Sequence, residues 1–439
     1  MFGTSGIRGP VGEEVTASLA LSVGRALGVD CDRVVVGRDV RESGLYLVDA
    51  LTAGLRESGV DVVDLGVAPT PTIARAVSWE GANAGVSVTA SHNPPEDNGL
   101  KLWQPTGQAF DSALRGKIEQ RIRTEQSTLV DWTDIGTRTA RNYTQTHCQQ
   151  LVDAVDLEEP LSVVVDVGNG TGGVTVDALE SLGCQVETLN AQPDGAFPGR
   201  PSEPTAENCT SLSALVTNSD ADLGIAHDGD ADRMRAVADD GEFLSGDVTL
   251  AIFAREAASA GERVAVPVDT SLAVEDHLRE GGIETTRTPV GDVYVAERAT
   301  EPDVSFGGEP SGAWIWPDET LCPDGPLAAC KLVSLAATRE LSSRVAAVDT
   351  YPIRRDSVEV QNKMAVMEEV TARVEERYES VSTIDGVRVD FGDAWFLLRA
   401  SGTQSLIRLT AEARQSERAD TVLTEARDHL SDAIGATTY

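Results

Sequence analysis

The sequence predicts an α/β protein with three similar mixed α/β domains, followed by a smaller α+β domain. One plan of apolar strands alternating with helical stretches recurs three times before about residue 350, and such alternation favours parallel α/β layers. The remainder carries closely spaced strands and two helices, which favours an antiparallel sheet. A chain of 439 residues also exceeds a single hydrophobic core, so several domains are expected.

In the first copy of the plan, residues 33–39 and 60–65 form strands, and a helix around 72–77 leads to a third strand at 85–88. The alternation of small and apolar residues in this third strand predicts that it is buried. The other copies place strands at 162–166, 184–189, 222–226, 263–268, 283–286 and 303–306. Each third strand ends in a loop rich in functional groups.

The last part of the chain is expected to hold a strand at 354–360, a helix at 363–378, a hairpin at 385–399, a strand at 405–413 and a closing helix at 416–434. The predicted domains are 1–141, 142–246, 247–347 and 348–439.

Composition excludes some partners. The net charge is −35, and only four residues are lysines, so nucleic acid and anionic membranes are not expected to bind. A dispersed acidic surface resembles the adaptation to high-salt cytoplasms, where ions screen self-repulsion.

The six cysteines lie far apart without a C-x-x-C pair, which is typical of a reducing compartment rather than a disulfide framework or zinc site. No signal peptide and no long apolar run is found in the sequence. We therefore expect a soluble cytoplasmic protein; the oligomeric state stays open.

Ser91 is the candidate nucleophile. It follows the third strand of the first copy, beside His92 and ahead of Lys101, and the carboxyl ends of strands are where ligands bind in α/β sheets. An ordinary turn is the alternative, because Ser, Asn and Pro are common turn residues. A serine hydrolase is not favoured, since no G-x-S-x-G is present and an adjacent Ser-His pair is no triad.

Three alternating carboxylates follow the third strand of the second copy, at Asp228, Asp230 and Asp232. In an extended loop they can converge on one Mg²⁺, which prefers oxygen ligands. An EF-hand does not fit, because Arg233 stands where that loop needs Gly. A solvated acidic loop is the other alternative.

The loop 399–404, with sequence RASGTQ, offers an Arg, two hydroxyls and a Gly, a set that suits a dianionic phosphate. It lacks the spacing of a nucleotide P-loop, and a simple turn with a surface Arg is its alternative. Glu309 and Ser311 are suited to sugar hydroxyls, and Arg8 in GTSGIRG to an anion. The turn at 168–172 resembles a dinucleotide loop but lacks the full G-x-G-x-x-G, so a structural role is predicted.

Together these segments resemble the α-D-phosphohexomutase family, which includes phosphoglucomutase/phosphomannomutase and phosphoglucosamine mutase. The matching stretches are FGTSGIRG at 2–9, TASHNPPEDNGLK at 89–101, DGDADR at 228–233, GEPSG at 308–312 and RASGTQ at 399–404, with further likeness in LNAQPDGAFPGRPSEP at 189–204 and TPVGDVY at 288–294. The resemblance spans essentially the whole chain. It implies four domains around a central cleft.

The resemblance also implies roles. Ser91 would carry a phosphoryl group and, with the three carboxylates, hold Mg²⁺. Phosphoryl transfer depends mostly on positioning and charge stabilisation, so cations are needed around a phosphoserine. The remaining implied roles are positive charge from Arg8, Arg233 and Lys101; proton handling by Lys101 or His92; sugar binding by Glu309 and Ser311; and phosphate binding by Arg399, Ser401, Gly402 and Thr403.

The implied reaction interconverts hexose 1-phosphate and 6-phosphate through a sugar 1,6-bisphosphate, which also serves as activator. Two departures affect proton handling and substrate preference: Ala313 stands where the family often has His, and Gln404 and Ser405 replace the usual Glu-Pro. The sugar stays open among glucosamine, glucose and mannose phosphates, with TPVGDVY favouring the glucosamine branch. Phosphopentomutase, a metal-dependent sugar-phosphate phosphatase and a non-catalytic sensor are the alternative functions.

Overall fold

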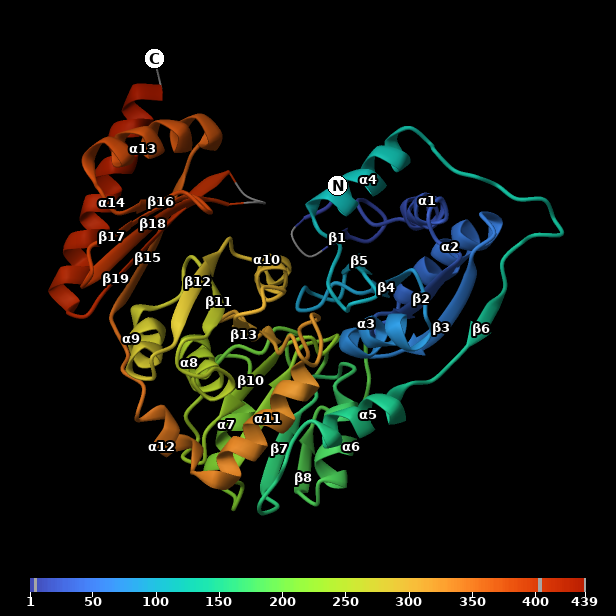
Figure 1. The fold of residues 1–439 in the computed structure, drawn as a ribbon, viewed down its shortest axis with the longest axis horizontal. Helices are drawn as coiled ribbons and strands as arrows, with labels where there is room; N and C mark the ends of the chain where they lie inside the picture. The colour runs from blue at the N-terminus through green and yellow to red at the C-terminus, as the bar shows by residue number, and fades with distance from the viewer. Residues whose placement is uncertain (4–5, 402–404, 438–439) are drawn as a thin grey trace.

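Four β-sheets follow one another along the chain in the computed structural model, which describes residues 1–3, 6–401 and 405–437 (Figure 1). The first three sheets are mixed, and the fourth is antiparallel throughout. In Figure 1 they run from the blue region on the right, through green and yellow, to the red region at the upper left. The predicted fold class is therefore confirmed.

The first sheet has six strands in the order β1-β5-β4-β2-β3-β6. Its strands are β1 (Ile7–Pro10), β2 (Arg33–Arg38), β3 (Asp61–Val67), β4 (Ala84–Val88), β5 (Asp97–Trp103) and β6 (Arg138–Ala140). Its helices are α1 (Ala17–Leu27), α2 (Gly44–Glu57), α3 (Thr70–Trp79) and α4 (Ser112–Arg123).

The second and third sheets have four strands each, in the orders β10-β9-β7-β8 and β12-β11-β13-β14. The second region comprises α5 (Thr144–Asp153), β7 (Ser162–Asp166), α6 (Gly173–Ser181), β8 (Gln185–Leu189), α7 (Thr210–Thr217), β9 (Leu223–His227) and β10 (Met234–Val237). The third comprises α8 (Gly246–Ala257), β11 (Arg263–Pro267), α9 (Leu272–Glu280), β12 (Glu284–Thr288), α10 (Asp292–Arg298), β13 (Val304–Gly308), β14 (Trp314–Ile315), α11 (Gly325–Thr338) and α12 (Leu341–Val345).

All three sheets share one plan, which confirms the threefold pattern. In each sheet the first strand of the plan (β2, β7 or β11) lies between the second (β3, β8 or β12) and the third (β4, β9 or β13). The third strand pairs antiparallel with a return strand, which is β5, β10 or β14. The sequence interpretation missed these return strands. Their consequence is that each functional loop is the turn of a hairpin, so both of its ends are fixed by a sheet.

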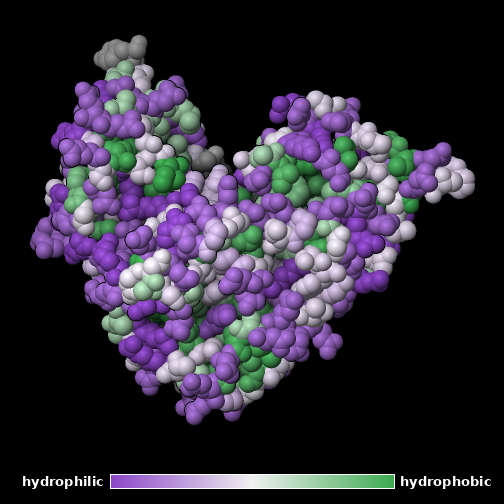
Figure 2. Space-filling model, viewed as in Figure 1, coloured by the Kyte–Doolittle hydropathy of each residue, from purple (hydrophilic) through white to green (hydrophobic). Residues whose placement is uncertain are grey.

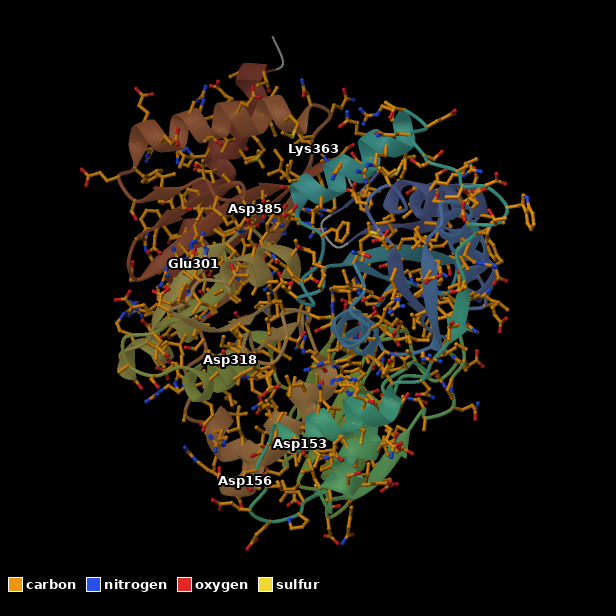
Figure 3. All side chains as sticks on the ribbon, turned by 45° about the vertical axis from the view of Figure 1, so that its right-hand side comes forward. Asp153, Asp156, Glu301, Asp318, Lys363 and Asp385 are labelled. Atoms are coloured by element: carbon orange, nitrogen blue, oxygen red, sulfur yellow. The ribbon has the colours of Figure 1, made fainter. Side chains whose placement is uncertain are left out.

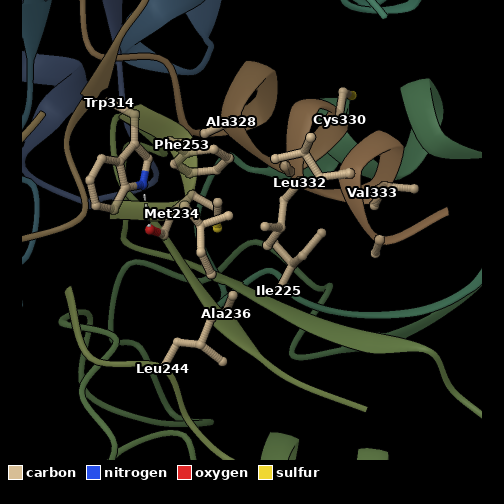
Figure 4. Packing of buried hydrophobic residues seen from close by; sticks show 14 of the residues in the cluster. Ile225, Met234, Ala236, Leu244, Phe253, Trp314, Ala328, Cys330, Leu332 and Val333 are labelled. Atoms are coloured by element: carbon tan, nitrogen blue, oxygen red, sulfur yellow. Dashed lines mark hydrogen bonds between the residues drawn. The ribbon is translucent and has the colours of Figure 1, made fainter. Parts of the chain in front are cut away.

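The second and third regions are interlocked through one continuous apolar core. Helix α11 belongs to the third region, yet Leu327 and Cys330 share a cluster with Ile225 and Met234 of the second sheet. Figure 4 shows this packing, with the Trp314 indole donating to the Met234 carbonyl at 3.0 Å. The second and third sheets therefore share one hydrophobic core.

The fourth sheet has the order β15-β19-β18-β17-β16. Its elements are β15 (Ile353–Glu359), α13 (Lys363–Arg377), β16 (Val381–Ser382), β17 (Val387–Asp390), β18 (Ala394–Ala400), β19 (Leu406–Ala413) and α14 (Ser416–Thr437). Because side chains alternate along a strand, Phe396 and Leu398 pack with the two helices while Trp395 and Leu397 pack with Val268 of the third domain. One strand thus joins two cores.

The surface is mainly hydrophilic, and Figure 2 shows it notched between the fourth domain and the first. This notch is where the resemblance places a central cleft. Over the described residues, no helix combines the length and hydropathy that a bilayer crossing needs. The domain boundaries given above remain a prediction.

Candidate active site

The loop that carries Ser91 connects β4 to β5 and is held in an unusual conformation. Ser91 has a φ of 55°, in the left-handed region that non-glycine residues rarely adopt. The Thr89 hydroxyl accepts the Ser91 N–H at 2.8 Å, and Ser91 is only 1 % exposed. Such a conformation persists only where the surroundings impose it.

Arg41 supplies much of that constraint. Its guanidinium is fully buried and donates to the carbonyls of Ser91 at 2.9 Å, Asn93 at 2.6 Å and Asp97 at 2.9 Å, and also to that of Pro94. Asp39 fixes the guanidinium through Nε at 3.0 Å and also accepts from the Thr89 hydroxyl at 2.7 Å.

The Ser91 hydroxyl meets the acidic loop between β9 and β10. Its Oγ donates to Asp228 Oδ2 at 2.7 Å. Carboxylate oxygens of Asp228, Asp230 and Asp232 all lie within 4.8 Å of one another. The predicted convergence of the three carboxylates, and of the serine with them, is thus observed.

Lys101 and Thr70 complete this junction from the first domain. The Lys101 ammonium donates to Asp230 Oδ2 at 2.7 Å and to Asp232 Oδ2. The Thr70 hydroxyl donates to the same Asp230 oxygen at 2.6 Å. Burial alone would lower the pKa of Lys101, but the two carboxylates outweigh it and raise the pKa.

The carboxylates differ in their electrostatics. Burial and the two neighbouring carboxylates raise the pKa of Asp228 well above its usual value. Burial would raise the pKa of Asp230 too, yet Lys101 outweighs it and lowers the pKa. Crowding of this kind is costly unless cations or a metal compensate.

The donor set fits a hard divalent cation. Within the described part of the chain, Asp230 Oδ1 and Asp232 Oδ1 are buried without a hydrogen-bond partner. Buried carboxylate oxygens are costly to leave unsatisfied, and oxygen ligands are those that Mg²⁺ prefers. Asp228, Asp230 and Asp232 could therefore hold the ion, together with an oxygen on Ser91.

Further cations surround the serine. Burial first, and then Arg233, Arg8 and Lys101, lower the pKa of His92 to about 2, so its ring is neutral near neutral pH. The His92 Nδ1 lies 3.3 Å from Ser91 Oγ. The Arg8 Nε is buried with no hydrogen-bond partner among the described residues, which suits an anion arriving beside the serine.

The predicted sugar-binding residues lie in the hairpin turn between β13 and β14. Glu309 Oε1 accepts from the Gly291 N–H at 2.7 Å, and Ser311 Oγ donates to Glu309 Oε2 at 3.2 Å. Burial and the nearby Asp292 raise the pKa of Glu309 to about 7, while Arg233 opposes this rise. The backbone of Arg233 forms an antiparallel bridge with Ala313, which brings the acidic loop beside this turn.

The predicted phosphate-binding loop, 399–404, begins at the end of β18 in the fourth domain. Arg399 Nη1 donates to Asp385 Oδ2 at 3.1 Å, and Ser401 is buried, with its carbonyl accepting from the Lys363 ammonium. Figure 3 labels Lys363 and Asp385 on this domain. Gly402 and Thr403 lie outside the described residues, as do Thr4 and Ser5 of the first motif.

Sequence reasoning missed the residues that hold the site together. These are Asp39, Arg41, Thr70, Ser202, Lys363 and Asp385. Asp39 stood at the end of a predicted strand, Asp385 at the start of the predicted hairpin and Ser202 within the family-like stretch 189–204, but no role was predicted for any of them. The 168–172 turn has the structural role predicted, since the Asn169 side chain bonds the backbone of Gln192 at 2.8 Å and Gly199 at 2.9 Å.

Comparison with known proteins identifies the family. Sequence models of the phosphoglucomutase/phosphomannomutase α/β/α domains I, II and III match residues 1–129, 142–241 and 245–351, and that of the C-terminal domain matches 357–429. A "probable phosphoglucosamine mutase" of Methanopyrus kandleri is 46 % identical over 99 % of this chain and 97 % of its own. One from Methanosarcina acetivorans is 45 % identical over 99 % of each chain.

Solved structures of other proteins show the same fold. A phosphoglucomutase/phosphomannomutase family protein from Burkholderia thailandensis is 29 % identical, covers 99 % of this chain and 98 % of its own, and superposes with a TM-score of 0.88. A phosphoglucomutase from Paramecium shares the fold, with a TM-score of 0.78 at 20 % identity over 99 % and 94 % of the two chains. With four matching domain models and relatives alike from end to end, the chain belongs to the phosphoglucomutase/phosphomannomutase family, the isomerases of the α-D-phosphohexomutase superfamily.

Proposed function

We propose that this protein interconverts hexose 1-phosphate and hexose 6-phosphate through a phosphoserine at Ser91. The observation that carries the proposal is the bond of 2.7 Å between Ser91 Oγ and Asp228, at the centre of a buried carboxylate triad. An ordinary turn would not explain a serine hydroxyl that donates to a buried carboxylate of the acidic loop.

In the first step the phosphorus–Oγ bond of phospho-Ser91 breaks, and a bond forms to the free C1 or C6 oxygen of the sugar phosphate. The proton of that sugar hydroxyl passes to a nearby acceptor, for which His92 and Lys101 are the candidates. The neutral His92 ring can take it directly, whereas Lys101 is an ammonium held by Asp230 and Asp232 and would first have to pass its own proton to one of these carboxylates. The product is a 1,6-bisphosphate, and the reverse transfer of its other phosphate restores phospho-Ser91.

The remaining side chains would position the substrate and balance the charge of its phosphates. Arg8 and Arg233 would balance the charge of the transferred group. Bound Mg²⁺, held by the three aspartates and an oxygen on Ser91, would supply further positive charge. Glu309 and Ser311 would bind the sugar hydroxyls.

The phosphate that is not being transferred would be bound on the fourth domain. Arg399 and Ser401 lie there, and Gly402 and Thr403 belong to the same proposed set. A guanidinium can bind a phosphate through two parallel bonds. Because the bisphosphate must present either phosphate to Ser91, one distant site has to accept the sugar in two orientations.

A glucosamine phosphate is the proposed substrate. The relatives that share 45–46 % identity with this chain carry the name phosphoglucosamine mutase, and TPVGDVY favours the same branch. The alternatives within the chemistry are glucose, mannose and pentose phosphates. A trace of the 1,6-bisphosphate would act as activator by phosphorylating Ser91.

Phosphorus NMR can test the proposal. The protein is incubated with Mg²⁺, a trace of bisphosphate and, in separate tubes, the 1-phosphates of glucosamine, glucose, mannose and ribose. Conversion of a hexose 1-phosphate to its 6-phosphate is expected, fastest for glucosamine, and Ser91→Ala should abolish it. Free phosphate would indicate a phosphatase, and binding without turnover a sensor; either result contradicts the proposal.

We also infer that the protein works in a salt-rich cytoplasm. A net charge of −35 destabilises a compact state unless salt screens it. Urea denaturation in KCl from 0.1 to 3 M should show the free energy of unfolding rising with salt. Indifference to salt would contradict this inference.

A further inference from the structure

The segment 189–204 resembles the family, yet the reaction as proposed gives it no task. It leaves β8 and crosses to the Ser91 loop of the first domain. Ser202 lies within it and is 2 % exposed. Its Oγ donates to the Ser91 carbonyl at 2.8 Å and accepts from the Gly229 N–H at 3.0 Å. A hydroxyl can donate and accept at once, so one atom joins the nucleophile's residue to the middle of the acidic loop.

This contact acts on a backbone that needs support. Ser91 sits at a positive φ of 55°, and its carbonyl accepts two bonds, from Arg41 at 2.9 Å and from Ser202 at 2.8 Å. Arg41 belongs to the same domain as the serine, whereas Ser202 comes from the second domain. Ser202 therefore contributes what Arg41 cannot: the placement of the serine loop against the acidic loop.

Ser202 is itself held firmly. The Arg200 guanidinium donates to the Ser202 carbonyl at 3.3 Å, to Asp166 at 2.7 Å and to the His227 carbonyl at 2.6 Å. The Arg41 guanidinium lies over the Phe197 ring, 5.0 Å from its centroid. The segment is thus fixed on both sides of the domain boundary.

Space around the contact is closed. A Cβ on Gly229 would lie 2.9 Å from Ser202 Oγ and 3.0 Å from the Ser91 carbonyl oxygen. Both distances are at or below the limit for non-bonded heavy atoms. The glycine between the first two aspartates of the acidic loop is therefore needed for the serine loop to approach.

We infer that Ser202 is a positioning residue for phosphoryl transfer. It sets the distance between Ser91 Oγ and the carboxylates of the acidic loop without touching the substrate. The inference rests on the proposed function, since it assumes that Ser91 is the phosphoryl carrier. Small misplacements of reacting groups cost much rate, about a hundredfold for 1 Å.

A purely structural role makes a different prediction. If Ser202 only stabilised the domain boundary, its removal would lower the melting temperature and leave kcat intact in the folded protein. Ser87 provides the matched control, because it is fully buried in β4, four residues before Ser91, and accepts a bond from the Trp103 indole at 2.9 Å.

The experiment compares Ser202→Ala, Ser202→Cys and Ser87→Ala with the unchanged protein, using the hexose 1-phosphate that gives turnover. For Ser202→Ala, kcat should fall about tenfold to a hundredfold with KM within threefold, because substrate contacts are untouched. Ser202→Cys, with a weakly hydrogen-bonding thiol, should fall between, and Ser87→Ala should keep its kcat. Melting temperatures measured in parallel confirm that each variant is folded.

A kcat of Ser202→Ala within twofold of the unchanged protein would overturn the inference, as would an equal loss in Ser87→Ala. If Ser202→Ala does not fold, Ser202→Cys decides by the same criterion. Ser91→Ala, run alongside, separates the two proposals. Turnover by Ser91→Ala would remove the phosphoserine mechanism itself, whereas an inactive Ser91→Ala with a fully active Ser202→Ala would overturn only the role of Ser202.

Discussion

The junction between the first and second domains contrasts with the proposed phosphate-binding loop of the fourth domain. At the junction, the side chains of Lys101 and Asp230 are 3 % and 1 % exposed. At the loop, those of Arg399 and Asp385 are 24 % and 26 % exposed. The proposed site of transfer is thus buried, whereas the side chains proposed to bind phosphate stay in contact with water.

The contrast corresponds to the two tasks of the proposed reaction. Transfer requires fixed atoms, because its rate depends on the alignment of the reacting groups. The site for the distant phosphate has to accept both orientations of the sugar. The fourth domain is joined to the third nearby, since Asp385 accepts from the Val290 N–H at 3.1 Å and Glu412 accepts from the buried Ser271 hydroxyl.

The largest effect is expected from Asp39→Asn, which breaks the frame of the serine loop. The amide keeps the shape of the side chain, but it replaces one carboxylate oxygen by an NH2 group. A donor then faces the donors of Arg41 and Thr89. Arg41 would lose its buried counter-charge, and breaking a buried pair costs about 3–5 kcal/mol. We expect the free energy of unfolding in urea to fall by about that amount and kcat to fall by about a hundredfold.

Asp324→Asn is the matched control for this prediction. Asp324 is fully buried and pairs with Arg75 at 2.9 Å and with His147 at 3.2 Å, neither of which belongs to the serine loop. It should lose comparable stability but keep kcat in the folded protein. Equal losses of kcat in the two variants would mean that the frame around Ser91 is not special.

Arg399→Lys tests the proposed phosphate-binding loop. A lysine keeps the charge but cannot bind a phosphate through two parallel bonds. KM should rise about tenfold, equivalent to about 1.4 kcal/mol of binding free energy, and kcat should stay within threefold. Arg373→Lys, on α13 of the same domain, is the control, since Arg373 pairs with Glu369 of its own helix. A fall in kcat at unchanged KM would place Arg399 with the transfer chemistry instead.

Glu309 lies between the two regions and gives a pH test. Its pKa is raised to about 7 by burial and Asp292, with a smaller rise from Asp269 and an opposing effect of Arg233. The carboxylate is therefore protonated below about pH 7. If the ionised form binds sugar hydroxyls, kcat/KM should fall as the pH drops from 8 to 6. In Glu309→Gln kcat/KM should be low and flat over that range.

The free energy of unfolding should respond to pH in the opposite sense. The raised pKa means that the fold disfavours the ionised form, so this group's contribution to stability is present at low pH and is lost as the pH rises through 7. Relative to the unchanged protein, Glu309→Gln should gain free energy of unfolding at pH 8 but not at pH 5. A variant that is equally affected at both pH values would contradict the assigned pKa.

Sequence patterns predicted the parts of the site that carry a chemical signature. The strand ends were identified by apolar runs, and the triad by carboxylates that alternate after a buried strand. Ser91, Asp230 and Glu309 were each predicted in the loop after the third strand of their copy, and the family resemblance alone implied that these loops share one cleft.

The supporting residues could not be predicted in this way. Arg41 and Ser202 bond backbone groups, and Asp39 bonds the Arg41 guanidinium and the Thr89 hydroxyl. Any polar residue in a loop is compatible with such roles. Their partners at Thr89 and Ser91 lie 50 to 111 positions away in the chain, a separation that leaves no local pattern. The return strands were missed for a related reason: β10 and β14 are short, and β14 has only two residues.

The smallest effect is expected from Arg354→Ala, at the outer edge of the fourth domain. Arg354 and Asp420 form a pair at 2.6 Å with side chains 31 % and 61 % exposed, and exposed pairs contribute little because water and salt screen them. In 2 M KCl the urea midpoint and kcat should both be unchanged. In 0.1 M KCl a slight loss of stability is expected, because the substitution removes a positive charge from a chain of net charge −35. A loss at both salt concentrations similar to that of Asp39→Asn would show that burial is not what separates the two regions.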